Sequence, residues 1–235
     1  MAPTTVTPTA TITTTGIVMT DGTAHLVRLL SWLSPAFPVG AFAYSHGLER
    51  AVHDGLIEDR SALTDWLSEI VQSGSGWNDA ILLAEAWRLA SRGESCAAIA
   101  ELAEAMVGTR ERHRETMLQG EAFGQAVAHW TGEAIGPMPY AVAIGQAAAR
   151  HGIALDQALA GFLHAFTANL IQAAIRLVPL GQRDGVLSLA ALEPIILATA
   201  RRASLATLDD LGACTLMSDI VSMRHETQYS RIFRS

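Results

Sequence analysis

The chain has 235 residues, of which half are hydrophobic and only 17% are charged, and its mean hydropathy is +0.26. Its net charge of −7 and isoelectric point near 5.6 argue against a nucleic-acid-binding protein, because such proteins normally carry a basic excess. Charges interrupt the apolar stretches, so we expect no helix with the roughly 20 apolar residues that are needed to span a membrane. Burial against another protein chain then explains the apolar excess.

Two features bear on compartment and domain organisation. The cysteines, Cys96 and Cys214, lie far apart and outside any CxxC or Cys/His cluster, as is typical of free thiols. Residues 1–16 are rich in Thr and Pro and lack the basic and apolar regions of a secretory signal. We therefore expect a cytoplasmic protein with a disordered extension over residues 1–22 and a single domain over residues 23–235.

Helical periodicity begins at residue 24 and ends before Pro35, since proline disfavours a helical conformation in the residue that precedes it. The apolar face of this first helix would consist of Leu26, Leu29, Leu30 and Leu33. Further helices are predicted over residues 45–53, 61–71 (with Ser61 as N-cap), 79–91, 95–107, 109–130, 139–151, 155–177 and 184–204. Pro194 should kink the last of these or start a new helix.

No alternating apolar run flanked by turn residues predicts a strand. Frequent alanine favours closely packed helices, since alanine is the strongest helix former. The sequence therefore predicts an all-α fold, a single globular bundle of about eight to ten helices, with a flexible N-terminal extension and a flexible C-terminal tail.

Motifs of common enzymes are missing from the sequence. There is no pair of Glu-x-x-His motifs for a di-metal centre, and no HExxH, P-loop, GxSxG or GxGxxG motif, so no catalytic residue is predicted. The only weak metal candidates are His46 and His53, which would share a helical face with Glu49 between them. A helical-bundle metal-binding enzyme that uses these histidines and nearby carboxylates is the alternative interpretation.

Three segments do not fit a simple division into core and surface residues. Residues 34–49, SPAFPVGAFAYSHGLE, fit either a buried corner between helices or a partner-binding surface. Residues 177–185, LVPLGQRDG, fit a structural turn, in which Gly181 and Gly185 would permit a sharp change of direction. Residues 224–235, RHETQYSRIFRS, form a basic and aromatic tail that is typical of a protein interface, unless it docks on its own domain.

The candidate residues follow from these segments. The turn residues are Pro179, Gly181, Gln182, Asp184 and Gly185. The candidate partner-binding residues are Pro38, Gly40, Phe42, Tyr44, Ser45 and Glu49 in the first segment, and Arg224, His225, Glu226, Gln228, Tyr229, Arg231, Phe233 and Arg234 in the tail.

Together, the three segments resemble the UreF family of urease accessory proteins, whose pattern is approximately SPxxPVGxFxYSxGLE, then LVPLGQxDG, then RHETQYxRLFRS. The resemblance extends roughly over residues 24–235, and residues 109–120, TRERHRETMLQG, more loosely resemble a charged helix of the family. Ile232 stands where the family more often has leucine, which is a conservative difference. The Thr-rich extension has no counterpart in the family.

The resemblance implies a non-catalytic, all-α homodimer that helps to mature the nickel centre of urease. Its expected partners are UreD (also called UreH), the GTPase UreG and urease apoprotein, with the tail packing on UreD and the dimer surface presenting UreG. Nickel would be the cargo and GTP would bind UreG, so no stably bound cofactor is expected. Modulation of the GTPase through an arginine supplied in trans is a further hypothesis, for which the sequence singles out no residue. Neither nucleic acid nor a membrane is an expected partner.

Overall fold

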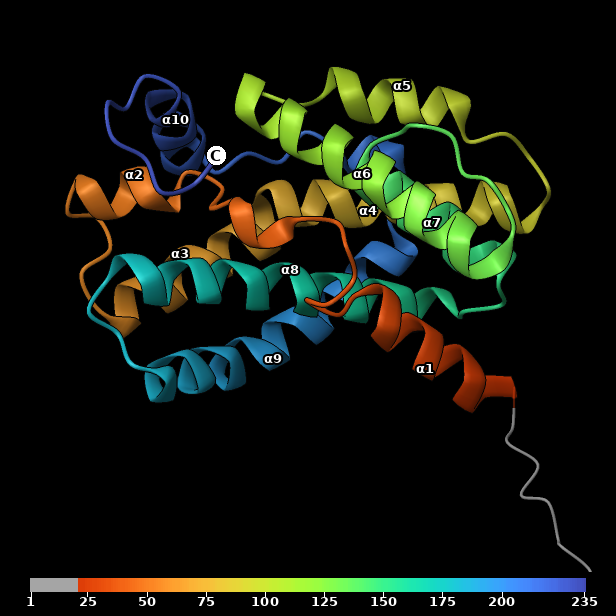
Figure 1. Ribbon diagram of the computed structural model, residues 1–235, viewed down its shortest axis with the longest axis horizontal. Coiled ribbons are helices and arrows are strands. Elements are labelled where there is room, and N and C mark those ends of the chain that lie inside the picture. Colours follow the sequence, from red (N-terminus) through yellow and green to blue (C-terminus); the bar gives the residue numbers. More distant parts are fainter. Residues whose placement is uncertain (1–20) are drawn as a thin grey trace, which may run out of the picture.

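The computed structural model describes residues 21–235, so residues 1–20 of the predicted extension lie outside the described residues. The described part is built of helices and contains no strand, which confirms the all-α prediction (Figure 1). Its elements are α1 (Asp21–Trp32), η1 (Ala41–Ala43), α2 (Leu48–His53), α3 (Arg60–Ser73), α4 (Ser75–Ser91), α5 (Ala97–Ala105), α6 (Arg110–Thr131), α7 (Tyr140–Arg150), α8 (Leu155–Leu177), α9 (Gln182–Leu205), η2 (Leu208–Asp210) and α10 (Leu216–His225). The elements η1 and η2 are single turns of 3₁₀-helix.

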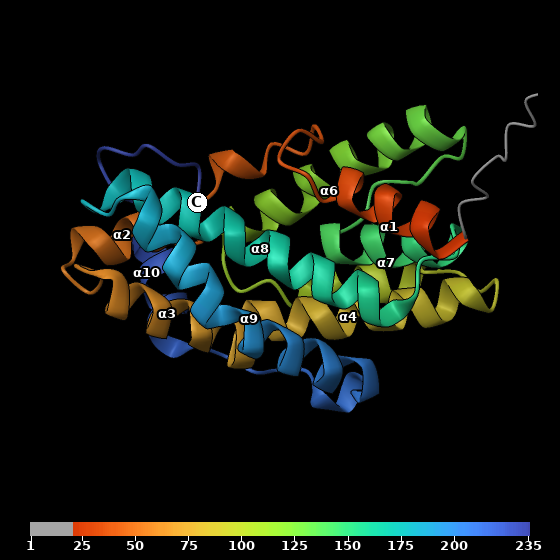
Figure 2. The same cartoon turned by 90° about the horizontal axis from the view of Figure 1, so that it is seen from below.

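The core lies where α4 and α8 pack against their neighbours (Figures 1 and 2). The pairs with the largest contacts are α4 with α7, α8 with α9, α3 with α9, and α6 with α7. Leu83, Ile144 and Leu163 from three of these helices belong to one buried cluster. At Gly145, α7 lies so close to α4 that a Cβ atom would be 2.3 Å from the backbone oxygen of Leu83. Small residues therefore set the spacing of these two helices.

Helix α8 departs from the expectation that charges interrupt every apolar stretch. It carries Asp156 and Arg176 only near its ends, and by length and composition it could cross a membrane. Half of its most apolar window is buried in the structure, where α8 packs against α1, α2, α4, α7 and α9. Its apolar character is therefore that of a core helix.

Several helix boundaries differ from the predicted ones for local reasons. Helix α3 begins at Arg60 because Asp59, rather than Ser61, is its N-cap and accepts a hydrogen bond of 2.8 Å from the N–H of Ala62. Helix α9 continues through Pro194 as one helix. Pro194 lies on the exposed side of α9, where the carbonyl group that loses its partner can face solvent.

Helix α1 buries a different face from the predicted one. Leu29 and Trp32 are buried, whereas Leu26 and Leu30 are 44% and 63% exposed. The reason is that α1 lies at the edge of the bundle and packs mainly on α8, so only a narrow stripe is covered (Figure 2). Cys96 is buried and Cys214 is exposed, and both are free thiols.

Of the expected turn residues, Pro179 and Gly181 lie in the connection between α8 and α9, whereas Gln182, Asp184 and Gly185 belong to the start of α9. The N–H of Gly181 donates to the carboxylate of Asp184 and so caps α9. Neither glycine has a positive φ angle. Gly185 instead permits close packing, since a Cβ atom there would lie 2.5 Å from Cδ1 of Ile175. The turn therefore depends on the cap, and Gly185 serves the contact between α8 and α9.

Candidate functional site

The C-terminal segment returns to the domain instead of leaving it. After α10, residues 226–235 run without regular structure beside α2 and η1 (Figure 1). The carboxylate of Glu49 accepts hydrogen bonds from the N–H groups of Ile232 (2.7 Å) and Phe233 (2.8 Å). The N–H of Arg234 donates to the carbonyl oxygen of Ala43 at 2.8 Å. Glu49, a candidate partner-binding residue, thus holds the tail on its own domain.

A buried polar cluster joins the tail to α2 and α6. His225 is fully buried, with Nδ1 2.7 Å from Oε2 of Glu111 and Nε2 3.3 Å from Oε2 of Glu49. Arg231 Nη1 lies 2.5 Å from Oε1 of Glu111. Because buried carboxylates are tolerated only when they are paired and hydrogen-bonded, these contacts stabilise one position of the tail.

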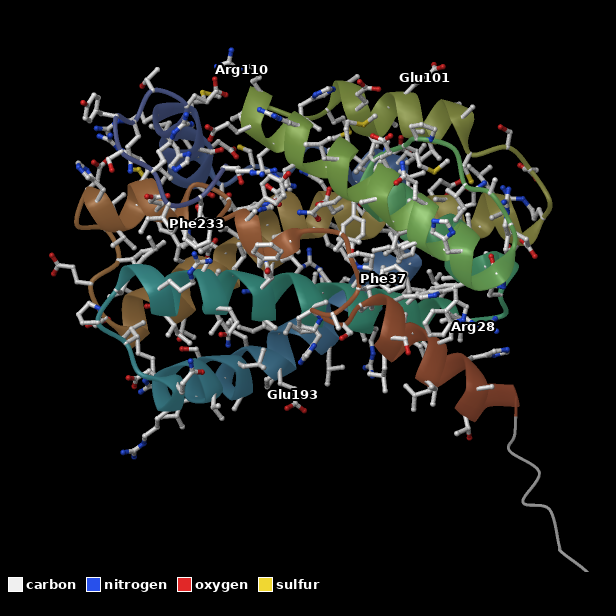
Figure 3. All side chains as sticks on the ribbon, viewed as in Figure 1. Arg28, Phe37, Glu101, Arg110, Glu193 and Phe233 are labelled. Carbon is white, nitrogen blue, oxygen red and sulfur yellow. The ribbon has the colours of Figure 1, made fainter. Side chains whose placement is uncertain are left out.

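The end of the tail is equally well packed. Phe233 is 4% exposed, and the guanidinium of Arg176 lies 4.5 Å from its ring centroid. Figure 3 shows Phe233 between α2 and α8. The backbone oxygen of Ser235 accepts hydrogen bonds from the N–H (2.8 Å) and the hydroxyl of Ser45, and its own hydroxyl donates to Glu115 at 2.9 Å. The tail residues that face inward are therefore His225, Phe233 and Ser235.

The outer side of the tail is exposed. Tyr229 is fully exposed and Ile232 is 62% exposed. Helix α10 adds a stripe of exposed apolar side chains at helical spacing, namely Leu216, Ile220 and Met223. Arg224, Arg231 and Arg234 are also exposed, and Arg224 Nη1 lies 2.6 Å from Oδ2 of Asp54. Of the remaining candidates, Glu226 and Gln228 are half-buried. We call Leu216, Ile220, Met223, Tyr229 and Ile232 the outer tail surface.

The segment of residues 34–49 serves as both a core corner and a surface. Tyr44, Ser45 and Glu49 are buried, whereas Pro38 and Phe42 are exposed, Phe42 by 72%. Gly40 is half-buried and adopts a left-handed φ of 72°. Both interpretations of this segment therefore apply, each to different residues.

At Gly47 the same segment meets α10. Its φ is 77°, and a Cβ atom would lie 2.9 Å from Cα of Ser222. Only glycine fits this combination of conformation and close approach. The contact fixes α10 against the start of α2.

The two candidate metal-binding histidines do not share a helical face. Helix α2 begins only at Leu48, because His46 has a φ of 57° and Gly47 is also left-handed. His46 is buried, and its Nδ1 lies 3.3 Å from both Glu115 and Arg112. Burial and the charge of Arg112 lower the pKa of His46. His53 is exposed and contacts Asp54. Among residues 21–235, no group of three His, Cys, Asp or Glu side chains could hold a metal ion.

Sequence reasoning missed several residues of this site. Glu111 and Glu115 are buried although they belong to the most charged helix, α6, and they receive the tail. The loose motif around residues 109–120 was the only signal of their importance. The exposed stripe of α10 could have been found from its helical spacing next to the tail.

Comparisons with known proteins give one consistent family for the chain. The family model named UreF matches residues 57–193. The chain is 55% identical over 222 residues to urease accessory protein UreF 1 of Brucella abortus, covering 93% of this chain and 97% of the relative. It is 55% identical over 223 residues to urease accessory protein UreF of Mesorhizobium japonicum, covering 92% and 100%. It is 51% identical over 228 residues to UreF 1 of Brucella anthropi, covering 95% and 99%. The chain therefore belongs to the UreF family of urease accessory proteins.

Proposed function

We propose that this protein is a non-catalytic co-chaperone of urease maturation, a scaffold that assists GTP-dependent insertion of nickel into urease apoprotein. It acts in the cytoplasm as a homodimer, together with UreD (UreH) and the GTPase UreG. Nickel is the cargo of this complex, and GTP is bound by UreG. The observation that carries the proposal is the identity of 55% over almost the whole length of proteins named urease accessory protein UreF.

The outer tail surface is the proposed docking site for UreD. Its five apolar side chains are exposed on α10 and the segment that follows it, and patches of exposed apolar side chains mark binding sites. Tyr229 is an aromatic anchor of the kind that dominates protein interfaces, and Arg224, Arg231 and Arg234 lie around it in the same segment. The inward contacts of Glu49 and His225 hold this surface in place.

Co-expression with UreD and UreG, followed by measurement of the mass of the purified complex, tests the proposed function. Failure of the wild-type chain to assemble with either protein would contradict it. Light scattering of the isolated chain tests the homodimer, whose mass would be about twice 25.0 kDa.

Point variants test the tail separately. Deletion of residues 224–235 would also remove buried His225 and Phe233, so substitution of exposed side chains is cleaner. The double variant Tyr229→Ala, Ile232→Ala should lose at least tenfold in recovery of UreD, since interface anchors contribute roughly 2 kcal/mol or more. The control Leu205→Ala removes an 81% exposed side chain of α9 and should retain the complex. Unchanged recovery with the double variant would contradict the assignment of UreD to this surface.

A further inference from the structure

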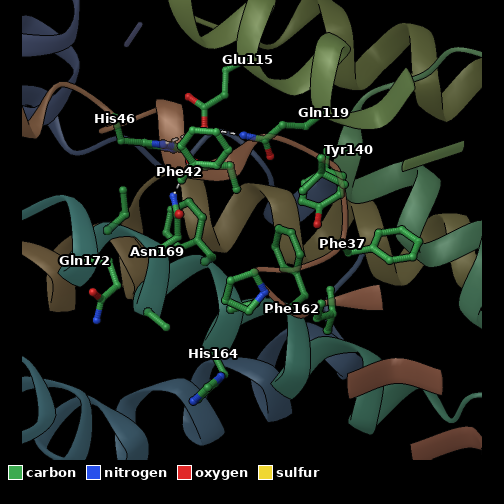
Figure 4. Close-up of a pocket in the computed structure, with 18 of the residues that line it drawn as sticks. Phe37, Phe42, His46, Glu115, Gln119, Tyr140, Phe162, His164, Asn169 and Gln172 are labelled. Carbon is green, nitrogen blue, oxygen red and sulfur yellow. Dashed lines mark hydrogen bonds and ion pairs between the residues drawn. The ribbon is translucent and has the colours of Figure 1, made fainter. Parts of the chain in front are cut away.

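A cavity of about 340 Å³ lies among residues 33–42, α6, the start of α7 and the middle of α8 (Figure 4). Aromatic side chains form much of its wall. The ring centroid of Phe162 is 6.2 Å from that of Tyr140 and 6.3 Å from that of Phe166, and Phe37 lines the same space. Pockets that enclose small ligands have volumes of roughly 300–1,000 Å³ and are lined mainly by such side chains. The cavity is therefore large enough for one aromatic ring.

One end of the cavity is polar. Figure 4 shows the hydroxyl of Tyr140 and the side-chain oxygen of Gln119 directed into the space. No hydrogen bond joins the Tyr140 hydroxyl or the Gln119 oxygen to another described residue, and neither atom is among the fully buried polar atoms. His46 lies at the same end, and its buried Nε2 also lacks a partner. His46 Nε2 is the buried atom here that lacks its normal pairing, while the Tyr140 hydroxyl and the Gln119 oxygen are open to a guest, so this end is suited to a guest that carries a hydrogen-bonding group.

The orientation of Gln119 follows from its neighbour. Its amide group lies 3.3 Å from Oε1 of Glu115. Although burial opposes ionisation, the charge of Arg112 lowers the pKa of Glu115, so its carboxylate only accepts hydrogen bonds. The Gln119 NH₂ group must therefore face Glu115, and its oxygen faces the cavity. Burial raises the pKa of Tyr140, whose hydroxyl keeps its proton. The cavity thus offers an oriented acceptor and a hydroxyl group.

The rim of the cavity is continuous with the tail. Phe42, which is 72% exposed, stands on η1 and lines the cavity. The carbonyl oxygen of Ala41 accepts from Nδ2 of Asn169 at 3.0 Å, which ties η1 to α8. The carbonyl oxygen of Ala43 accepts from the N–H of Arg234 at 2.8 Å, which ties η1 to the tail. A protein docked on this side of the molecule would therefore cover both the tail and the mouth of the cavity.

We propose that the cavity receives an aromatic side chain with a hydrogen-bond donor, tyrosine or tryptophan, from a protein partner; this rests on the scaffold function proposed above. The aromatic walls accept the ring, and the oxygen of Gln119 accepts the hydrogen bond of the phenol or indole. Phenylalanine fits less well, because it would leave the polar end unpaired. An aromatic anchor seated in such a pocket is the usual centre of an interface.

Probe binding to the purified full-length chain tests the chemistry of the cavity. The probes are p-cresol, which is the side chain of tyrosine, and toluene, which has the same ring without the donor. Ligand-detected NMR titration should show p-cresol binding about fivefold more tightly, as one hydrogen bond would give. Gln119→Leu should abolish the preference. The control Gln125→Leu lies on the same helix, is exposed and loses an equivalent bond to Glu121, and it should retain the preference. Equal binding of both probes by the wild-type chain, or binding of neither, would overturn the proposal.

Complex assembly then tests the source of the side chain. Ala165→Phe fills the cavity from α8, and it should lose p-cresol binding and reduce recovery of the complex at least fivefold, with an unchanged circular-dichroism spectrum. Gln119→Leu conserves the volume of the side chain, so its recovery of the complex serves as a second test if Ala165→Phe does not fold. An excess of p-cresol should also reduce assembly. If a folded variant no longer binds p-cresol but still assembles normally, the aromatic group does not come from a protein partner. The cavity would then bind a free aromatic molecule.

The two proposals fail separately. If the wild-type chain assembles with neither UreD nor UreG, the scaffold function is refuted, and so is the idea that a partner supplies the aromatic side chain. The probe titrations still decide whether the cavity recognises a donor-bearing ring.

Discussion

Glu49 carries the largest share of the contacts that hold the tail, so its removal is the most informative perturbation. Its carboxylate accepts two backbone N–H groups at 2.7 and 2.8 Å and faces Nε2 of His225 at 3.3 Å. Each hydrogen bond to a charged group contributes roughly 1.5–3 kcal/mol, so Glu49→Ala should weaken docking of the tail by at least about 3 kcal/mol. Glu49→Gln keeps one acceptor oxygen and should have a smaller effect.

Native-state hydrogen exchange measures this loss directly. Because 1.4 kcal/mol is a tenfold change in an equilibrium constant, exchange of the amides of residues 232–234 should accelerate by roughly a hundredfold or more in Glu49→Ala. The core of α8 should be unaffected. Glu193→Ala, which removes an exposed carboxylate on α9, is the control and should exchange like the wild-type chain (Figure 3). Unchanged exchange over residues 226–235 in Glu49→Ala would refute the inference that Glu49 holds the tail.

Three further predictions concern stability and metal content. Burial lowers the pKa of His46 below its ordinary value of 6.5, so the unfolded chain binds more protons at this residue than the folded chain does. The free energy of unfolding should therefore fall as the pH drops below about 6.5. The urea midpoints at pH 7.5 and pH 5.5 should differ less in His46→Phe than in the wild type. Gly145→Ala should lower the free energy of unfolding measured in urea by up to about 3 kcal/mol, since the new Cβ atom would collide with the carbonyl group of Leu83. In the control Gly108→Ala the new Cβ atom meets nothing within 4 Å, so the loss of stability should be far smaller. Elemental analysis after dialysis should find far less than one metal ion per chain, and stoichiometric retention would favour the metal-enzyme alternative.

Local sequence patterns predicted most helices, because their apolar spacing is a property of neighbouring residues. Helix α8 has the predicted bounds, residues 155–177, since its periodicity is long and proline follows it. Helix α2 starts three residues later than expected, at Leu48 instead of residue 45. The left-handed conformations of His46 and Gly47 that delay it are needed for the contact with Ser222, which is remote in sequence. Single-sequence patterns do not contain such a contact.

The candidate site shows the same limit more strongly. Composition identified the tail as unusual, and Tyr229 is exposed as a partner-binding residue would be. The inward direction of His225 and Phe233 depends on Glu49, which is separated from them by 176 and 184 positions. Glu111 and Glu115 were not among the candidate residues, because nothing near them in sequence shows that the tail covers them.

The long sequence separation between Glu49 and its partners has a consequence for protein synthesis. The carboxylates of Glu49 and Glu111 emerge from the ribosome early, while His225 and Arg231, which contact them in the finished fold, are made near the end. At roughly 5–20 residues per second, the nascent chain spends on the order of ten seconds or more with these acids unpaired. During that interval the two carboxylates must stay hydrated, so the contacts of the tail with α2 and α6 form last. A chain that ends before residue 225 would leave Glu49 and Glu111 without these partners, and this local difference would distinguish it from the mature protein.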